Sequence, residues 1–372
     1  MIDLIYIRDT NRKVINIIDN FSSIIWHCVY YGVGDFEIYV PATQDAIDTL
    51  KRGYYVTREG RQDVGIIEKI EFTFDTSSGF MLTATGRFAK SILERRLIYK
   101  LSDNTITPVV FSGLVETSVR SMVNANIINA TDTTRNISYI KLGELANLPA
   151  RIVTQEGNAA DTQTSYKNLF NYSEELLQEY GYGAKMTLDQ ETNNLIYSVY
   201  EGTDRTRSGE EPIIFSQEFD NILTADYTED DTALKNTALC GGEGEGTARK
   251  FVIVTNGQTG ENRREVFIDA SSQSQTYKDA EGSEQQYSDA VYLNMLRTAA
   301  KAGLEAYKLT QTFDGEVDII NSGLEFEKDY FIGDKVTIED NILGIAQNVR
   351  IGEVTEVQDT SGYGVTLKLL DY

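Results

Sequence analysis

Many segments of the chain alternate hydrophobic and polar residues, which is the pattern of half-buried β-strands. Tyrosine is abundant, at 22 residues, and it often lies among Val, Ile, Thr and Phe, which favours strands over helices. The predicted strands cover residues 4–8, 14–18, 23–31, 35–40, 54–59, 64–74, 80–85, 184–188, 195–201, 213–216, 222–227, 237–240, 251–255, 265–268, 309–319, 329–338, 345–358 and 363–370. The chain is therefore expected to be rich in β-structure.

Three stretches carry apolar residues at helical spacing instead. Thr107 and Pro108 offer a capping hydroxyl and a proline at the first helical position, so a helix is expected from there to Val123. Two more long helices are predicted over 165–180 and 288–307, and short ones over 43–50 and 87–96. The helices fall mostly in the middle of the chain, which indicates α+β character there.

One internal similarity links the two ends of the chain. Residues 53–59 read Gly-Tyr-Tyr-Val-Thr-Arg-Glu and residues 333–339 read Gly-Asp-Lys-Val-Thr-Ile-Glu, with Gly, Val, Thr and Glu in the same places. Each is followed by a hairpin-like stretch, a turn at 75–79 or 359–362, and a closing apolar strand. The chain either contains two β-units of one kind or shows a chance agreement between two hairpins.

Length and charge narrow the classes of protein. At 372 residues the chain exceeds the roughly 250–300 residues of a single core, so several domains are expected. A net charge of −23 repels phosphates, which argues against groove-type nucleic-acid binding and against docking on an anionic membrane. The charge serves solubility, or it lines a conduit that passes DNA without holding it; charge alone leaves both open. With no signal peptide and no apolar run of about 18 residues, we expect a soluble protein without a membrane anchor.

The sequence offers little chemistry. His27 is the sole histidine, and the two cysteines, Cys28 and Cys240, are far apart, so neither a zinc site nor a disulfide framework is expected. Neighbours in a strand point to opposite faces, so His27 and Cys28 cannot form a catalytic pair. We interpret His27 as a histidine at the surface or at the edge of the core.

Other polar clusters also have a structural interpretation. The glycine-rich segment 241–246 lacks the Lys-Ser/Thr of a phosphate loop, and its glutamates would repel a phosphate. Segment 189–194 lacks the glycine of a calcium loop, so a hairpin turn is expected there. Acidic residues are expected on the outward face of the second helix (Glu174, Glu175 and Glu179) and in loops (Glu210, Glu211, Asp230 and Asp231). No catalytic, cofactor-binding or metal-binding residue is predicted, and the protein is not expected to be an enzyme.

Residues near both ends resemble one protein family. The opening segment contains Phe21–Trp26, the aromatic pair and Gly-Asp-Phe-Glu turn of Tyr30–Ile38, and Val40-Pro41-Ala42. The closing segment contains Tyr330–Thr337, Arg350-Ile351 and Glu353-Val354. Between these two segments lie Asn236 and Gly242–Gly244. Together and in this order, they resemble the tail-associated hub proteins of siphoviruses and prophages. That family is related to the trimeric baseplate hub of contractile-tailed phages.

The resemblance implies an α+β, β-rich, multi-domain fold with two similar tube-type β-barrel units and inserted α+β domains. We expect the first barrel unit at 1–104, completed by about 207–228, an inserted α+β domain at 105–206, and the second barrel unit at 229–372 with a helical insertion around 288–308. Three chains would then supply six barrels to a sixfold tail tube. The internal similarity between 53–59 and 333–339 fits this expectation independently.

The implied function is structural: a homotrimeric hub at the tail tip or baseplate of the virion, made in the bacterial cytoplasm, with an acidic channel for DNA. Its expected partners are distal tail or tail tube proteins, a tape measure protein and a separate fibre or spike, because the chain stops at Tyr372 without the C-terminal domains of larger relatives. Two alternatives are a carbohydrate-binding module with exposed aromatics and a cell-wall glycosidase with two facing carboxylates, one of raised pKa.

Overall fold

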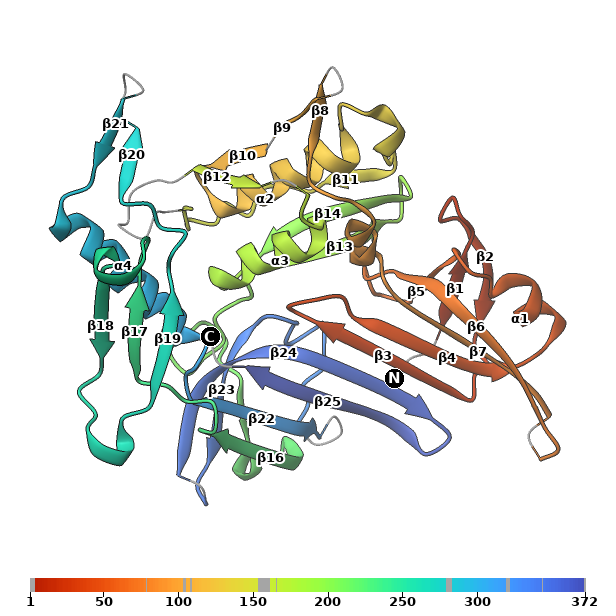
Figure 1. The fold of residues 1–372 in the computed structure, drawn as a ribbon. Helices are drawn as coiled ribbons and strands as arrows, with labels where there is room; N and C mark the ends of the chain where they lie inside the picture. The colour runs from red at the N-terminus through yellow and green to blue at the C-terminus, as the bar shows by residue number, and fades with distance from the viewer. Residues whose placement is uncertain are drawn as a thin grey trace. The chain divides into compact units, whose positions relative to one another are not determined.

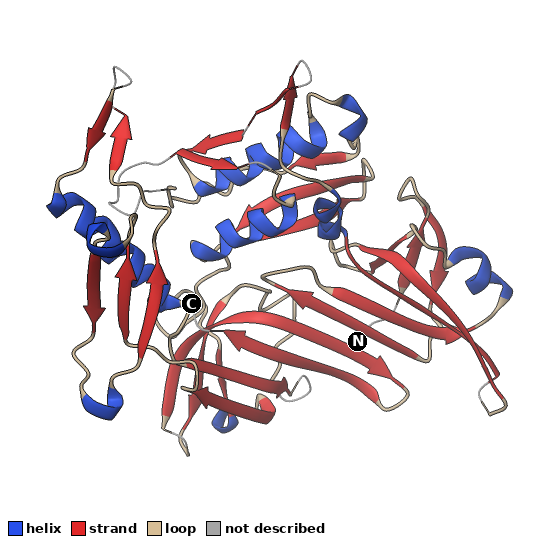
Figure 2. Ribbon diagram, in the orientation of Figure 1, coloured by secondary structure: helices blue, strands red, loops and turns tan. Residues whose placement is uncertain are grey.

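The computed structural model describes residues 4–77, 79–102, 105–107, 109–152, 161–164, 166–278, 283–318, 322–342 and 344–370 (Figure 1). The chain is β-rich with several sheets and few helices, as predicted (Figure 2). It separates into two compact units. The first unit comprises Met1–Ile152, Asp161–Asp226 and Phe313–Tyr372, and the second comprises Val153–Ala160 and Tyr227–Thr312. Among the described residues, no helix has the length and apolar character needed to cross a membrane.

A 13-stranded sheet dominates the first unit. Its N-terminal strands are β1 (Ile5–Arg8), β2 (Val14–Ile18), β3 (Ser23–Val29), β4 (Asp35–Pro41), β5 (Tyr55–Arg58), β6 (Gly65–Asp75) and β7 (Gly79–Phe88). Its C-terminal strands are β15 (Ile214–Ser216), β16 (Ile222–Asp230), β22 (Thr310–Val317), β23 (Lys335–Asp340), β24 (Ile345–Asp359) and β25 (Gly362–Leu370). The strand order is β16-β22-β25-β24-β3-β4-β7-β6-β5-β1-β2, with β23 beside β24 and β15 beside β23.

The two ends of the chain meet inside this sheet. The second half of β24 (353–359) pairs antiparallel with the whole of β3 (23–29) (Figure 1). The first half of β24 pairs with β23 instead. The strand order of the described residues runs from β16 at one end to β2 at the other and does not return to its start, so the sheets are not closed barrels. The predicted pair of closed β-barrels is therefore absent from the single chain.

The core of the N-terminal strands follows from strict alternation. Buried positions recur at every second residue of β3 and β4, and they include Trp26, Phe36 and Ile38, each no more than 1% exposed. A short helix, α1 (Gln44–Thr49), is capped by the Thr43 hydroxyl, which accepts from the amide of Ala46 (3.2 Å). A 3₁₀-helix over Ala89–Arg95 follows β7. Both short helices agree with their sequence predictions.

The similar segments 53–59 and 333–339 have the same backbone geometry. Gly53 and Gly333 both have positive φ angles, +83° and +92°. The amide of Gly53 donates to the carbonyl of Ile67 (2.7 Å), and the amide of Ile67 donates back to Tyr54 (2.9 Å). Gly333 makes the matching bond to Ile351 (2.8 Å), whose amide donates back to residue 334 (2.8 Å). The glycine turn thus sets the same start for β5 and β23.

The agreement continues through the following hairpins. The β6–β7 ladder shifts register between Ile67 and Lys69 and then runs to an Asp75–Gly79 pair. The β24–β25 ladder shifts between Ile351 and Glu353 and then runs to an Asp359–Gly362 pair. Both ladders have seven cross-strand pairs after the shift, so each position of one hairpin has a counterpart in the other. This shared register favours two β-units of one kind over chance agreement.

The middle of the first unit is α+β, as predicted. Helices α2 (Val115–Val123) and α3 (Leu169–Glu179) contact each other and a three-stranded sheet of β11 (Ile140–Leu142), β14 (Asn194–Tyr200) and β13 (Gly183–Asp189). The prediction of a helix start at Thr107 was wrong. Thr107 ends strand β9 (Thr105–Thr107), Pro108 lies outside the described residues, and the helix begins only at Val115. The residues between them form β10 (Val109–Ser112), which pairs with β12 (Asp161–Thr164); β8 (Lys100–Ser102) pairs with β9.

The second unit packs one helix on one small sheet. Strands β18 (Phe251–Thr255), β17 (Thr237–Gly241) and β19 (Glu265–Asp269) form the sheet, and α4 (Asp289–Glu305) contacts all three of them. The Ser288 hydroxyl caps α4 by accepting from the amide of residue 291 (3.4 Å), so the predicted helix is confirmed. A separate hairpin joins β20 (Thr276–Lys278) and β21 (Glu284–Gln286). The buried contacts centre on Tyr292, Leu296 and Ala300 of α4.

Candidate functional site

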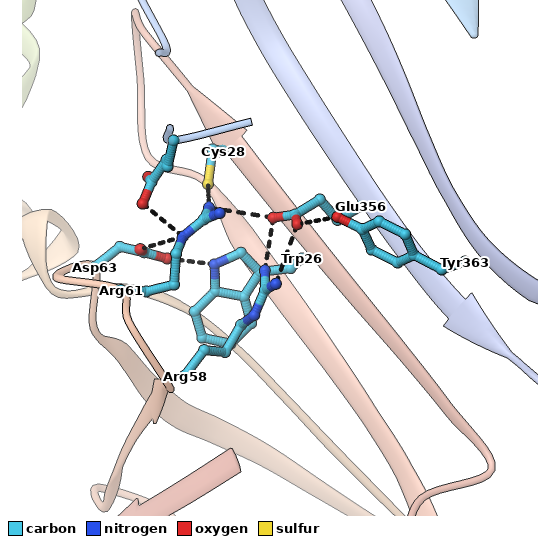
Figure 3. A network of polar contacts seen from close by, with 8 residues as sticks. Trp26, Cys28, Arg58, Arg61, Asp63, Glu356 and Tyr363 are labelled. Carbon is cyan, nitrogen blue, oxygen red and sulfur yellow. Dashed lines mark hydrogen bonds and ion pairs between the residues drawn. The ribbon is translucent and has the colours of Figure 1, made fainter. Parts of the chain in front are cut away.

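A buried cluster of charged side chains lies where β24 meets β3 (Figure 3). Glu356 of β24 is 2% exposed and receives both ends of the Arg58 guanidinium, at 2.6 and 3.0 Å. Arg61, from the turn after β5, also contacts Glu356, at 3.1 Å. The hydroxyl of Tyr363, on β25, donates to the same carboxylate. One carboxylate from the C-terminal strands thus forms ion pairs with two arginines from the N-terminal part of the chain.

Arg61 extends the cluster to two further carboxylates. Its Nε atom lies 3.2 Å from Asp63 Oδ1 and 2.6 Å from Glu327 Oε2. The indole nitrogen of Trp26 donates to the other oxygen of Asp63, and the Cys28 sulfur lies 3.9 Å from an Arg61 nitrogen. These charged groups are paired and hydrogen-bonded with one another within the cluster. Such pairing allows charged side chains to be buried away from water.

The cluster contains more carboxylates than guanidinium groups. As a result, the pKa values of Glu327 and Glu356 shift in opposite directions. Burial, reinforced by the neighbouring carboxylate of Asp63, raises the pKa of Glu327 to about 7. The pKa of Glu356 is lowered, because its bonds to Arg58 and Arg61 outweigh the opposing effect of burial. Burial raises the pKa of the Cys28 thiol well above its ordinary value, which disfavours the reactive thiolate.

A cavity of about 430 Å³ adjoins the cluster and is lined by Asp63, Glu327 and Cys28 together with Lys90 and Tyr200. A glycosidase needs two carboxylates with space for a sugar bond between them. Here Asp63 and Glu327 contact the same guanidinium nitrogen of Arg61, which occupies that space. The arrangement therefore suits a structural junction between strands better than general acid catalysis.

The structure places the sole histidine on the opposite face of β3 from its cysteine neighbour. His27 lies between two carboxylates, with Nδ1 3.1 Å from Asp35 and Nε2 3.1 Å from Glu353. Cys28 points instead into the buried cluster. The prediction that these two side chains cannot pair is confirmed. Both cysteines are free and buried, and the described residues contain no group of three or more potential metal ligands among His, Cys, Asp and Glu.

One of the three glutamates of the second predicted helix is not on its outward face. Glu174 side-chain exposure is 12%, and its carboxylate accepts from Lys90 Nζ (3.1 Å) and from the amide of Gly32 (2.7 Å). Glu175 and Glu179 are exposed, as expected. The prediction was wrong for Glu174 because the 3₁₀-helix that carries Lys90 packs against α3. Such a long-range partner has no signal in the local spacing.

The two segments considered as possible ligand sites form hydrogen bonds with other groups of the protein. In 241–246, the amide of Glu243 donates to the Tyr292 hydroxyl (2.7 Å), and Arg249 donates to the carbonyl of Gly242 (2.9 Å). The segment 189–194 is the turn between β13 and β14, where Asp189 accepts from the amide of Glu191 (3.0 Å). Loop and turn were the predictions for these segments, and both are confirmed.

Sequence reasoning missed the arginine–glutamate cluster. Arg58 occupies the place that Ile338, 1% exposed, holds in the matching segment 333–339. Glu356 likewise interrupts the apolar positions of a strand that is buried at Val354. A charged residue at a position that the repeat makes apolar is a signal for a buried ion pair, although the sequence does not say which residues are partners.

Replacing Glu356 with Gln should destabilise the protein strongly. The change leaves Arg58 and Arg61 buried beside a neutral amide, which typically costs about 3–5 kcal/mol. The matched control is Glu325→Gln, whose carboxylate forms a surface pair with Lys328 and has a side-chain exposure of 65%; its cost should stay below about 1 kcal/mol. The free energy of unfolding from urea titration measures both. Equal, small effects would contradict a stabilising role for the cluster.

Replacing Glu327 with Gln should change how stability depends on pH. The pKa of Glu327 is about 7 in the folded chain, above the usual value of about 4.3 for an unfolded glutamate. Folding therefore favours the protonated form, and its contribution is present at low pH and lost as pH rises through 7. The free energy of unfolding of Glu327→Gln, relative to that of the wild type, should therefore increase by about 1–3 kcal/mol as pH rises from 5 to 8. Unfolding titrations across this range test it; a constant difference would contradict the raised pKa.

A family profile described as Siphovirus ReqiPepy6 Gp37-like protein matches residues 4–369. No curated protein sequence matches the chain significantly.

Three solved structures have a similar fold. The tail protein of Neisseria meningitidis MC58 has 12% identity and a TM-score of 0.58, covering 99% of this chain and 96% of its own. The 43 kDa tail protein of prophage MuSo2 from Shewanella oneidensis has 13% identity and a TM-score of 0.59, covering 99% and 98%. Prophage tail protein gp18 of Listeria monocytogenes EGD-e has 14% identity and a TM-score of 0.51, covering 98% and 94%. The chain belongs to the Siphovirus ReqiPepy6 Gp37-like protein family.

Proposed function

We propose that this protein is the homotrimeric hub of a phage or prophage tail tip or baseplate. The observation that carries the proposal is the pair of matching four-stranded sets, β3-β4-β7-β6 and β16-β22-β25-β24, side by side in one sheet. Three chains would supply six such sets, and a ring of six suits a sixfold tail tube. The same ring would have true threefold symmetry, which suits a fibre or spike.

In this proposal the two strand sets are the tube-forming parts of the chain, and barrels close only when copies assemble. The first tube part would lie in residues 1–104. The second would combine β16 (Ile222–Asp230) with β22, β24 and β25, and residues 105–206 would be the inserted α+β domain. The net charge of −23 would repel DNA from the channel wall during passage. The partners would be distal tail or tail tube proteins, a tape measure protein and a separate fibre or spike, in the virion.

The protein would act without catalysis. The two carboxylates that line the cavity, Asp63 and Glu327, are occupied by Arg61, which gives the wall-hydrolase alternative no support. A carbohydrate-binding role has one observation in its favour. Phe251 and Phe267 are 46% and 50% exposed on the sheet of the second unit, with Arg249 5.5 and 5.4 Å from their ring centres. Exposed aromatic rings are frequent anchors at binding surfaces.

The purified protein should be a trimer, or should shift from monomer to trimer as its concentration rises. Light scattering behind a sizing column measures the mass directly, and three times the chain mass is the expected limit. A strict monomer that binds host cell-wall glycans, and loses that binding in Phe251→Ala, would overturn the trimeric hub in favour of the carbohydrate-binding alternative.

A further inference from the structure

The turn over residues 325–330 lies between β22 and β23, outside the strands. Its own hydrogen bonds close it: the amide of Glu327 donates to the carbonyl of Tyr330 (2.7 Å), and the amide of Asp329 donates to the carbonyl of Glu325 (2.9 Å). The buried ring of Tyr330 lies 5.9 Å from the ring of Phe215 on β15. The turn is therefore a self-contained segment that is anchored to the C-terminal strands.

Two other side chains attach this turn to the N-terminal part of the chain. The ring centre of Phe326 lies 4.7 Å from the central carbon of the Arg61 guanidinium, and the Glu327 carboxylate lies 2.6 Å from Arg61 Nε. Glu327 has a left-handed backbone conformation, with a φ angle of +62°. Such a conformation costs free energy in any residue except glycine, and it persists only where the surrounding contacts hold it. The contact with Arg61 thus holds Glu327 in a conformation that its backbone disfavours.

The charges around Arg61 do not balance when every group is ionised (Figure 3). Arg58 and Arg61 supply two positive charges, whereas Glu356, Asp63 and Glu327 supply three negative charges. A buried charge without a counter-charge is costly, so one carboxylate has to take up a proton or move into water. Glu327 is the most exposed of the three, with a side-chain exposure of 25%, against 20% for Asp63 and 2% for Glu356.

The other ionisable groups nearby have contacts of their own. The pairs around the cavity are Lys90 with Glu174 (3.1 Å), Glu201 with Lys335 (2.8 Å) and Asp334 with Arg205 (2.9 Å), and Lys185 lies 5.1 Å from the ring centre of Tyr200. On the turn, Lys328 pairs with Glu325 (2.8 Å), and Asp329 accepts from the amide of Glu325 (2.8 Å). Burial raises the pKa of the Cys28 thiol and of the Tyr330 and Tyr363 hydroxyls, so these groups are uncharged near neutral pH. The charge around Arg61 therefore changes with the proton on Glu327.

Release of Glu327 would leave the rest of the cluster balanced. Arg61 would keep Asp63 at 3.2 Å and Glu356 at 3.1 Å, so two carboxylates would face two guanidinium groups. An ionised Glu327 regains water outside the cluster, whereas a protonated Glu327 gains much less. Its pKa of about 7 in the closed turn, against about 4.3 for a glutamate in water, agrees with this difference.

We propose that the turn 325–330 is a proton-controlled latch between the N-terminal and C-terminal strands: it stays on Arg61 while Glu327 is protonated, and it opens toward solvent more often when Glu327 is ionised. Opening would uncover the cavity that Glu327 and Phe331 line together with Cys28. The latch goes beyond the proposed hub function, because it belongs to the single chain and does not depend on the number of copies in an assembly.

The pH range of the latch follows from the two pKa values of Glu327. Opening becomes more frequent as pH rises from about 4.3, the value in water, to about 7, the value in the closed turn, and it levels off above that. The equilibrium constant for opening should therefore increase between about 10-fold and 100-fold from pH 5 to pH 8.

Alkylation of Cys28 by iodoacetamide measures the opening. Cys28 is 7% exposed and lines the cavity, whereas Cys240 is buried in the second unit and serves as an internal reference. Dividing the wild-type rate by that of Glu327→Gln at each pH cancels the ordinary ionisation of the thiol. This ratio should rise about 10- to 100-fold from pH 5 to pH 8 at Cys28 and stay constant at Cys240. The matched control, Glu325→Gln in the same turn, has a side-chain exposure of 65% and should react at the wild-type rate throughout.

A direct electrostatic effect on the thiol has the opposite sign. Burial raises the pKa of Cys28, and the charge of Glu327 raises it further. Without opening, ionisation of Glu327 would therefore slow the reaction of Cys28, and the ratio would fall as pH rises. A falling or constant ratio, or an equal loss of the pH dependence in Glu325→Gln, would overturn the latch.

Low concentrations of urea separate the latch from unfolding of the whole unit. Dividing the wild-type rate by that of the fully denatured chain at each pH gives the same profile without any variant, should Glu327→Gln fail to fold. Global unfolding exposes far more surface than the release of one turn, so its contribution rises steeply with urea. The Cys28 rate should change little up to about 1 M urea. A steep rise would assign the reaction to unfolding and contradict the latch.

Discussion

The pairing of β24 with β3 is the contact on which the rest of the structure depends. It joins strands more than 300 residues apart in sequence, and ordering so long a loop has an entropic cost. The Arg58–Glu356 pair, 298 residues apart, lies at this seam and requires both ends of the chain to be in place. Removing β24 would leave the buried Arg58 and Arg61 without the carboxylate of Glu356. The seam therefore couples the N-terminal and C-terminal strand sets.

The same seam explains why the first unit is an open sheet. Of the two matching hairpins, β24 is paired with β3 along its second half, whereas among the described residues β6 is paired with β5 only at its start. The β6–β7 hairpin carries the neighbouring rings of Phe74 and Phe80, whereas β24 carries the paired Glu356. Apolar side chains suit a contact that forms by association, because their burial needs no charged partner. This difference fits an internal junction and an external one.

Much of the fold could be predicted from the sequence because local rules decide it. The alternation in β3 and β4, the capping residues Thr43 and Ser288, and the paired glycines at 53 and 333 each have a short-range cause. The predictions that were wrong concern residues whose structure depends on partners far away in the sequence. Thr107 ends a strand because the following residues pair with β12, and Glu174 is buried because Lys90 approaches it from another element. The buried cluster also joins distant segments and was not predicted, although the interrupted apolar pattern at Arg58 and Glu356 could have indicated it.

The repeat also shows why two closed barrels were expected and an open sheet was found. Sequence similarity indicates matching strand sets, but it does not show whether the sheet of one chain closes on itself. The seven matched pairs after each register shift give the two hairpins the same shape. A surface that fits β3 in one set should therefore fit its counterpart in the other.

Electron cryo-microscopy of the concentrated protein tests the central claim most directly, because it reports the symmetry of the assembly rather than its mass. We expect rings with threefold symmetry and near-sixfold repetition of the strand sets. Dimers with a twofold axis, or particles without threefold symmetry, would contradict the trimeric hub.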